Sequence, residues 1–181
     1  AYASDASLVV LRHPDSKSSV TAAKYASMVK PESVPIINAG SGTLEHPTQA
    51  LLDVMTIQAK LETIDNLKIA LVGDLLYGRT VKSLAMLMAR LGIDNNFAFV
   101  SAKQQKLPAE YLEQLPTGTP YAETEDLDEV LDWADVVYMT RPQKEWFKAN
   151  GEMEQYETIA EATKMTKQRA SQLHENAIIM H

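Results

Sequence analysis

Cationic and hydrogen-bonding side chains gather at a few loop-to-helix junctions of this 181-residue chain. Two segments do so most clearly: residues 46–49 (His-Pro-Thr-Gln) and residues 77–80 (Tyr-Gly-Arg-Thr), the second shortly after Asp74. At such junctions the free backbone N–H groups and the helix dipole favour an anion. Neither segment needs a metal, a cysteine or a glycine-rich dinucleotide loop. The sequence therefore predicts a site for anionic substrates.

Arginines recur just after the apolar runs that we expect to be strands: Arg12, Arg79 and Arg141. A guanidinium group binds carboxylate or phosphate through two parallel hydrogen bonds. In open parallel sheets, ligands bind beyond the carboxyl ends of the strands. We therefore expect these arginines to meet in a cleft that holds two anionic groups or molecules.

The same residues also have plainer interpretations that involve no ligand. An arginine after a strand is usually a solvated loop residue. His46, which precedes Pro47, could simply cap a helix. Asp74 fits the orientation of the Arg79 loop better than a role as general base. The recurrence of arginines at successive junctions is what favours a shared site.

The elements that would position these residues alternate between apolar runs and helical periodicity, which is typical of βαβ units and a parallel sheet. In the helix at 17–29 we expect Val20, Ala23 and Met28 to point inward. In the helix at 47–62 we expect an apolar stripe of Leu51, Val54, Met55 and Leu61. We expect a flexible loop at 39–42. The expected strands are 7–11, 34–38, 67–73, 97–100, 136–140 and 178–180, with an edge strand from residue 121, and the remaining helices are 81–91, 108–115, 127–133 and 154–173.

The periodicity stops near residues 63–66 and restarts with Leu67. This predicts an α/β fold with two doubly wound parallel-sheet units, each a three-layer αβα arrangement. The first, residues 1–64, is incomplete, and the second, residues 65–181, lacks its carboxyl-terminal end. We expect the chain to be a fragment, because it begins without methionine and stops at His181 directly after a strand.

Composition narrows the class of partner. The net charge of −7 argues against nucleic acid or an anionic membrane as the main partner, since both require a basic face. The absence of cysteine excludes disulfides and thiolate chemistry and suits a reducing compartment such as the cytoplasm. No apolar run approaches the roughly 20 residues that span a bilayer. Neither a dinucleotide-binding glycine motif nor a P-loop is present.

Several motifs in order along the chain resemble the aspartate carbamoyltransferase family, catalytic chain. They are Leu11-Arg12-His13-Pro14, Asn38-Ala39-Gly40, His46-Pro47-Thr48-Gln49-Ala50-Leu51-Leu52-Asp53, Val72-Gly73-Asp74, Tyr77-Gly78-Arg79-Thr80 and Tyr138-Met139-Thr140-Arg141-Pro142-Gln143. They span nearly the whole chain. The resemblance implies that residues 1–64 belong to a carbamoyl-phosphate-binding domain and residues 65–181 to an aspartate-binding domain.

The resemblance also implies an activity: transfer of the carbamoyl group from carbamoyl phosphate to L-aspartate, a step of pyrimidine biosynthesis that needs no cofactor or metal. Orientation and electrostatic stabilisation would supply the catalysis. By this resemblance, Arg12 would contact the phosphate and the carbonyl oxygen, and His46 would donate to that oxygen. Gln49 would bind the carbamoyl amino group. Aspartate would be bound by Arg79, Thr80, Arg141 and Gln143.

Ornithine carbamoyltransferase is the relative to exclude. It characteristically uses a cysteine, which this chain lacks, and Arg141 would repel an ammonium group. The family's Ser-Thr-Arg-Thr phosphate motif, its mobile loop and its Pro-Leu-Pro segment are absent here. We therefore expect the isolated chain to be inactive and the full-length form to be a homotrimer, with or without regulatory chains. The alternative hypothesis is a non-catalytic binding or assembly module.

Overall fold

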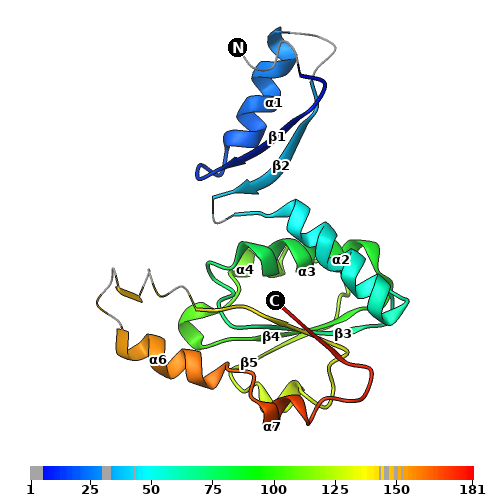
Figure 1. Ribbon diagram of the computed structural model, residues 1–181, viewed down its shortest axis with the longest axis vertical. Coiled ribbons are helices and arrows are strands. Elements are labelled where there is room, and N and C mark those ends of the chain that lie inside the picture. Colours follow the sequence, from blue (N-terminus) through cyan, green and yellow to red (C-terminus); the bar gives the residue numbers. More distant parts are fainter. Residues whose placement is uncertain are drawn as a thin grey trace.

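The computed structural model describes residues 6–29, 34–42, 44–142, 144, 147–148, 151 and 153–181. Its named strands form a two-stranded and a five-stranded sheet, and every pair of neighbouring strands is parallel (Figure 1). The parallel α/β architecture expected from the sequence is confirmed. Among the described residues, no helix has the length and apolar character to cross a bilayer.

The smaller sheet pairs β1 (Val9–His13) with β2 (Ile36–Ser41), and helix α1 (Ser18–Val29) lies along it. Helix α2 (Pro47–Leu61) then leads to the larger sheet. Pro47 opens this helix because the first helical position needs no N–H donor. We refer to residues 6–42, as described, as the small unit.

The larger sheet has the strand order β5-β4-β3-β6-β7, with helices on both of its faces (Figure 1). Helices α3 and α4 lie over one face, and α6 and α7 lie over the other. Two single-turn 3-10 helices, η2 and η3, complete the connections. The bounds are β3 (Lys68–Val72), α3 (Arg79–Leu91), β4 (Asn96–Val100), η2 (Lys103–Gln105), α4 (Ala109–Leu112), β5 (Tyr121–Thr124), η3 (Asp128–Val130), β6 (Val136–Met139), α6 (Met153–Ala162), α7 (Lys167–Ala170) and β7 (Ile178–Met180).

The core lies on both faces of the larger sheet. Successive side chains of β3 alternate, so that Ile69 and Leu71 join the cluster beneath α3, whereas Ala70 and Val72 join the cluster on the opposite face. All four are fully buried. A strand buried on both faces reads as a continuous apolar run, which explains why the sequence indicated this strand so clearly.

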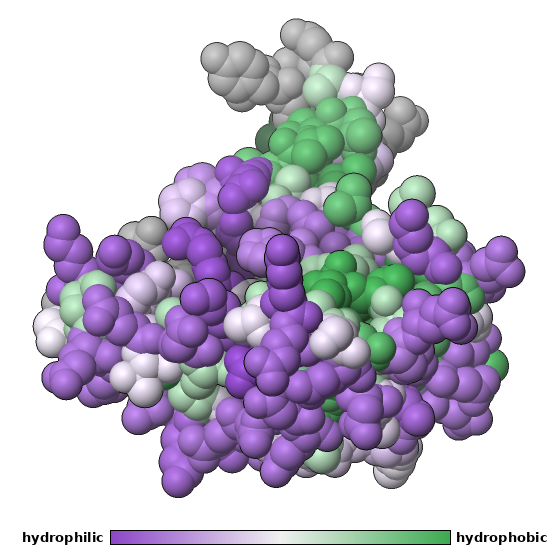
Figure 2. Space-filling view, turned by 60° about the horizontal axis from the view of Figure 1, so that its bottom comes forward, coloured by the Kyte–Doolittle hydropathy of each residue, from purple (hydrophilic) through white to green (hydrophobic). Residues whose placement is uncertain are grey.

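The expected apolar faces of the first two helices are largely wrong. Val20 and Met28 of α1 are 72% and 66% exposed, because the two strands beneath this helix are too few to cover it. In α2 the buried positions include Val54, as expected, and Ile57, whereas Leu51 and Met55 are exposed. Figure 2 shows the apolar surface that this leaves over the small unit.

Two expected helices are also wrong. The segment 127–133 contains only the 3-10 turn η3, since the Asp126 carboxylate accepts a hydrogen bond from the Asp128 N–H at 2.9 Å and tightens the chain there. The segment 154–173 forms α6 and α7 as separate helices, because Thr166 caps the start of α7 by accepting from the Arg169 N–H.

The loop expected at 39–42 is largely strand, since β2 runs to Ser41. The Asn38 side-chain oxygen accepts hydrogen bonds from the Gly40 N–H and the Ser41 hydroxyl, both at 2.9 Å. These two bonds hold the carboxyl end of β2 in a fixed shape beside β1.

Candidate functional site

A cavity of about 660 Å³ lies between the small unit and the larger sheet, bordered by β1, β6 and the start of both α2 and α3. It brings together six residues that sequence reasoning singled out: Arg12, His46, Gln49, Arg79, Thr80 and Arg141. The seventh, Gln143, lies outside the described residues. His181, which follows β7, also borders the cavity.

The turn between β3 and α3 positions Arg79. The buried Asp74 accepts a hydrogen bond from the Tyr77 N–H at 2.8 Å, and its own N–H donates to the Thr140 hydroxyl at 2.9 Å. A Cβ atom on Gly78 would lie 2.1 Å from the Asp74 carbonyl oxygen, so the turn closes this tightly only with glycine. Asp74 thus orients the Arg79 loop, as the plainer interpretation held.

Arg12 and Arg79 approach each other from the two sides of the cavity. Arg79 Nη1 donates to the Gly42 carbonyl oxygen at 2.7 Å. A Cβ on Gly40, whose φ is +132°, would lie 3.4 Å from Arg79 Nη1 and 3.6 Å from Arg12 Cγ. Burial and the nearby Arg12 charge lower the pKa of Arg79, yet a guanidinium remains charged in proteins. Two like charges held this close favour an anion between them.

His46 stands at the entrance to α2, and its backbone N–H donates to the Ser83 hydroxyl at 2.9 Å. His46 is the N-cap residue of this helix, as the plainer interpretation held, although its side chain makes no capping hydrogen bond. Burial, followed by the charges of Arg79 and Arg12, lowers the pKa of His46 below 6.5. At neutral pH the imidazole is therefore uncharged and offers one N–H donor.

Sequence reasoning assigned no role to two further residues: Asp53, which contacts Gln49, and Tyr138, which itself borders the cavity. Gln49 Nε2 donates to Asp53 Oδ1 at 3.0 Å, and both Asp53 and Tyr138 are 2% exposed. The Tyr138 hydroxyl is in hydrogen-bonding contact with the Asp53 carboxylate and with the Thr80 hydroxyl. The spacing of Gln49 and Asp53, four apart on one helix, was the available signal. The sequence contains no comparable signal for Tyr138, since this residue lies within an apolar strand.

Burial sets the protonation of this pair. It raises the pKa of Asp53, and the hydrogen bonds from Gln49 and Tyr138 offset part of that rise. Burial, followed by the charge of Asp53, raises the pKa of Tyr138 above its usual range. The tyrosine therefore keeps its proton and acts as a donor to the carboxylate.

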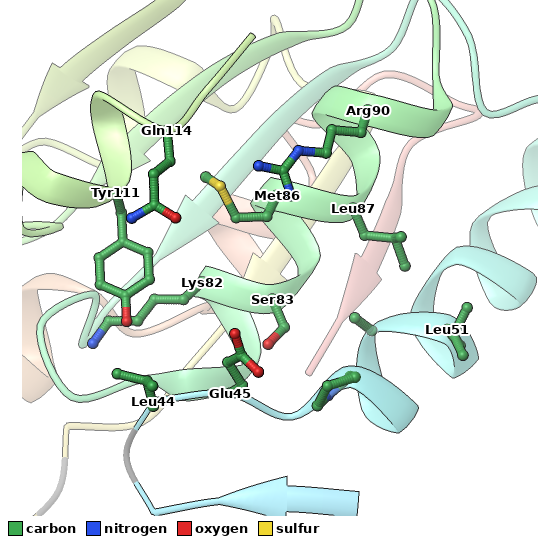
Figure 3. A pocket seen from close by; sticks show the side chains of 12 residues that line it. Leu44, Glu45, Leu51, Lys82, Ser83, Met86, Leu87, Arg90, Tyr111 and Gln114 are labelled. Carbon is green, nitrogen blue, oxygen red and sulfur yellow. The ribbon is translucent and has the colours of Figure 1, made fainter. Parts of the chain in front are cut away.

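A second cavity, of about 330 Å³, lies between α2 and α3 and has more apolar walls, among them Leu51, Met86 and Leu87 (Figure 3). Its buried cation, Lys82, is engaged within the protein: Nζ donates to the Leu76 carbonyl oxygen at 2.6 Å and lies 4.8 Å from the centre of the Tyr111 ring. These walls suit a small anion less well than the first cavity does.

The described residues hold no cluster of three or more histidine, cysteine, aspartate or glutamate side chains that could bind a metal ion. The first cavity instead gathers arginine and histidine side chains in a protein of net charge −7. The arrangement can bind two small anions side by side and place uncharged donors next to them.

Comparisons with known proteins match both parts of the chain to domains of one family. Residues 2–59 match the carbamoyl-P binding domain of aspartate/ornithine carbamoyltransferases, and residues 65–181 match their Asp/Orn binding domain. The aspartate carbamoyltransferase catalytic subunit of Methanobrevibacter smithii is 44% identical over 151 residues, which cover 82% of this chain and 45% of that protein. This chain spans about half the length of the curated relatives it matches.

Solved structures are similar as well. The aspartate transcarbamoylase of Trypanosoma cruzi in complex with carbamoyl phosphate has a TM-score of 0.85 and 34% identity, over 99% of this chain and 56% of that chain. The same enzyme in complex with carbamoyl phosphate and aspartate has a TM-score of 0.83 and 33% identity, over 99% of this chain and 55% of that chain.

Proposed function

Because the chain belongs to the aspartate/ornithine carbamoyltransferase family, we propose that its protein transfers the carbamoyl group of carbamoyl phosphate to L-aspartate. The products are N-carbamoyl-L-aspartate and phosphate, in pyrimidine biosynthesis. The observation that carries this proposal is the single cavity lined by Arg12, His46 and Gln49 from one side and by Arg79, Thr80 and Arg141 from the other.

The proposed roles follow from charge and hydrogen-bonding capacity. Arg12 binds the phosphate and the carbonyl oxygen, and the uncharged imidazole of His46 donates to that oxygen as negative charge develops on it. The aspartate amine attacks the carbonyl carbon, a C–N bond forms and the C–O bond to phosphate breaks. The departing phosphate takes up the proton that the amine loses. Gln49 binds the carbamoyl amino group.

Aspartate is the proposed acceptor because it brings two carboxylates to a cationic wall. Arg79 and Arg141 are the proposed partners of these carboxylates, with Thr80 in support. Gln143, beyond the described residues, is proposed to assist. Ornithine would bring an ammonium group to the same wall, where the two guanidinium groups would repel it.

We also propose a cellular compartment and an oligomeric state for the protein. We place it in the cytoplasm, since the sequence contains no cysteine. We propose a homotrimer for the full-length form, with or without regulatory chains. The exposed apolar side chains of α1, among them Tyr25 and Met28, support burial of that surface in a larger assembly. The 181-residue chain alone is proposed to be inactive.

The test is an assay of carbamoyl aspartate formation by the complete reading frame that encodes this chain. We expect Arg79→Ala to lower kcat/KM by about three powers of ten or more, because it removes a charged hydrogen-bonding partner of the substrate. Arg90→Ala is the matched control: it lies on the same helix, is exposed and does not line this cavity. An unchanged rate in Arg79→Ala would overturn the assignment.

Calorimetry on the 181-residue chain separates the two hypotheses about the protein. A chain with an intact anion site binds carbamoyl phosphate, aspartate or a compound that joins both, even without turnover. An assembly module binds none of them.

A further inference from the structure

The side-chain amide of Gln49 has only one orientation that satisfies its neighbour. Asp53 Oδ1 accepts a hydrogen bond from Gln49 at 3.0 Å, so the group that faces it is the amide nitrogen Nε2. The amide oxygen, Oε1, is then the atom left to accept a hydrogen bond from a ligand in the cavity that Gln49 lines.

Asp53 is itself held in place. It is 2% exposed on α2, and the Tyr138 hydroxyl from β6 contacts its carboxylate on the side of the larger sheet. Its second oxygen, Oδ2, is fully buried and has no hydrogen-bond partner of good geometry among the described residues. A buried carboxylate is costly unless it is hydrogen-bonded, which implies a role beyond packing.

We propose that Asp53 and Tyr138 are positioning residues that make the cavity selective for a ligand carrying an NH₂ group. They hold Gln49 with Nε2 turned inward, so that Oε1 accepts from the amino group of the carbamoyl moiety. This inference rests on the proposed function and assigns the two buried residues a part in donor selectivity.

The chemical consequence is discrimination between carbamoyl phosphate and acetyl phosphate, which carries a methyl group in place of the NH₂. A site whose polar group is oriented for a ligand donor disfavours the analogue that lacks it, because the oriented group is left unpaired. If Asp53 no longer accepts from Nε2, the Gln49 amide can rotate and present Nε2 to the ligand. The preference for the carbamoyl donor then falls.

The experiment measures kcat/KM for carbamoyl phosphate and for acetyl phosphate with aspartate as acceptor, in the protein from the complete reading frame. Asp53→Leu removes the acceptor at similar volume and is expected to lower the carbamoyl-to-acetyl ratio about tenfold. Asp53→Asn keeps an oxygen acceptor and should retain the ratio within about threefold. Asp132→Asn, an exposed carboxylate outside the cavity, is the matched control.

A folded Asp53→Leu protein that loses rate equally for both donors would overturn the proposal, because a purely structural role predicts that result. If this variant does not fold, Tyr138→Phe decides: it removes a single hydroxyl, and a folded protein with the wild-type ratio would also overturn the proposal. Absence of carbamoyl aspartate in the wild-type assay is a separate outcome, which overturns the proposed function itself.

Discussion

The charge state of single residues sets what the cavity can bind. Arg12, Arg79 and Arg141 carry permanent positive charge, whereas burial and the neighbouring arginines keep His46 neutral near physiological pH. A neutral imidazole donates one hydrogen bond without adding to the repulsion among the guanidinium groups. When a bound anion offsets the arginine charges, the same imidazole becomes easier to protonate.

We predict that the pKa of His46 lies below 6.5 in the free protein and rises when phosphate fills the cavity. The stability that the neutral form provides is fully present above pH 6.5 and is lost as pH falls through the lower folded pKa. NMR titration of the imidazole protons, assigned with His46→Gln, measures both values. A free-protein pKa at or above 6.5, or no change with phosphate, would contradict the electrostatic account.

Residue type and position at strand ends predicted most of the cavity. Arginines after strands and a histidine before a helical proline can be recognised along the sequence, and the structure brings them together. Asp53 and Tyr138 escaped notice because their significance depends on a contact between α2 and β6. A carboxylate on a helix reads as a solvated residue until its neighbours are known.

At the scale of elements, strands were easier to predict than helix ends. The central strands of the larger sheet, β3, β4 and β6, are apolar runs in the sequence because both of their faces are buried. The break between α6 and α7 depends on Arg169, whose Nη1 donates to the Ala162 and Lys164 carbonyl oxygens at 2.8 and 2.9 Å. Arginine is a good helix former, so its sequence position alone predicts continuation of the helix.

The junction of β3 and β6 depends on a glycine. Gly73 has a φ of +110°, and a Cβ there would lie 2.3 Å from the Thr140 carbonyl oxygen. We expect Gly73→Ala to lower the free energy of unfolding by about 3 kcal/mol or more, since the clash with backbone adds to the conformational strain. Chemical denaturation of the two proteins measures the difference.

Gly118→Ala is the matched control for this substitution. Gly118 also has a positive φ, +87°, but a Cβ there would meet nothing within 4 Å. It should cost only the conformational strain, about 1 kcal/mol. Equal losses in the two variants would mean that the contact with Thr140 does not constrain the junction.

At the scale of the whole molecule, α2 belongs structurally to both units. Its first turn carries Gln49 to the cavity, while Val54 and Ile57 are buried in the core cluster beneath α3. The domain boundary after residue 64 therefore stays a prediction. Dividing the chain there would remove two buried apolar side chains from the core of the larger sheet.

A comparison of two shortened chains tests how α2 contributes to the larger unit. We expect residues 44–181 to unfold cooperatively, and residues 65–181 to be less stable by about 3 kcal/mol or more, because each buried Val or Ile side chain contributes roughly 1.5–3 kcal/mol.

Within the full chain, Ile57→Ala should cost about 2–5 kcal/mol. Met55→Ala on the same helix should cost less than about 0.5 kcal/mol, since Met55 is 72% exposed. Denaturant titration followed by circular dichroism measures all four proteins. Equal stability of the two shortened chains would show that the larger sheet does not need α2, and the boundary after residue 64 would then hold as a physical division as well.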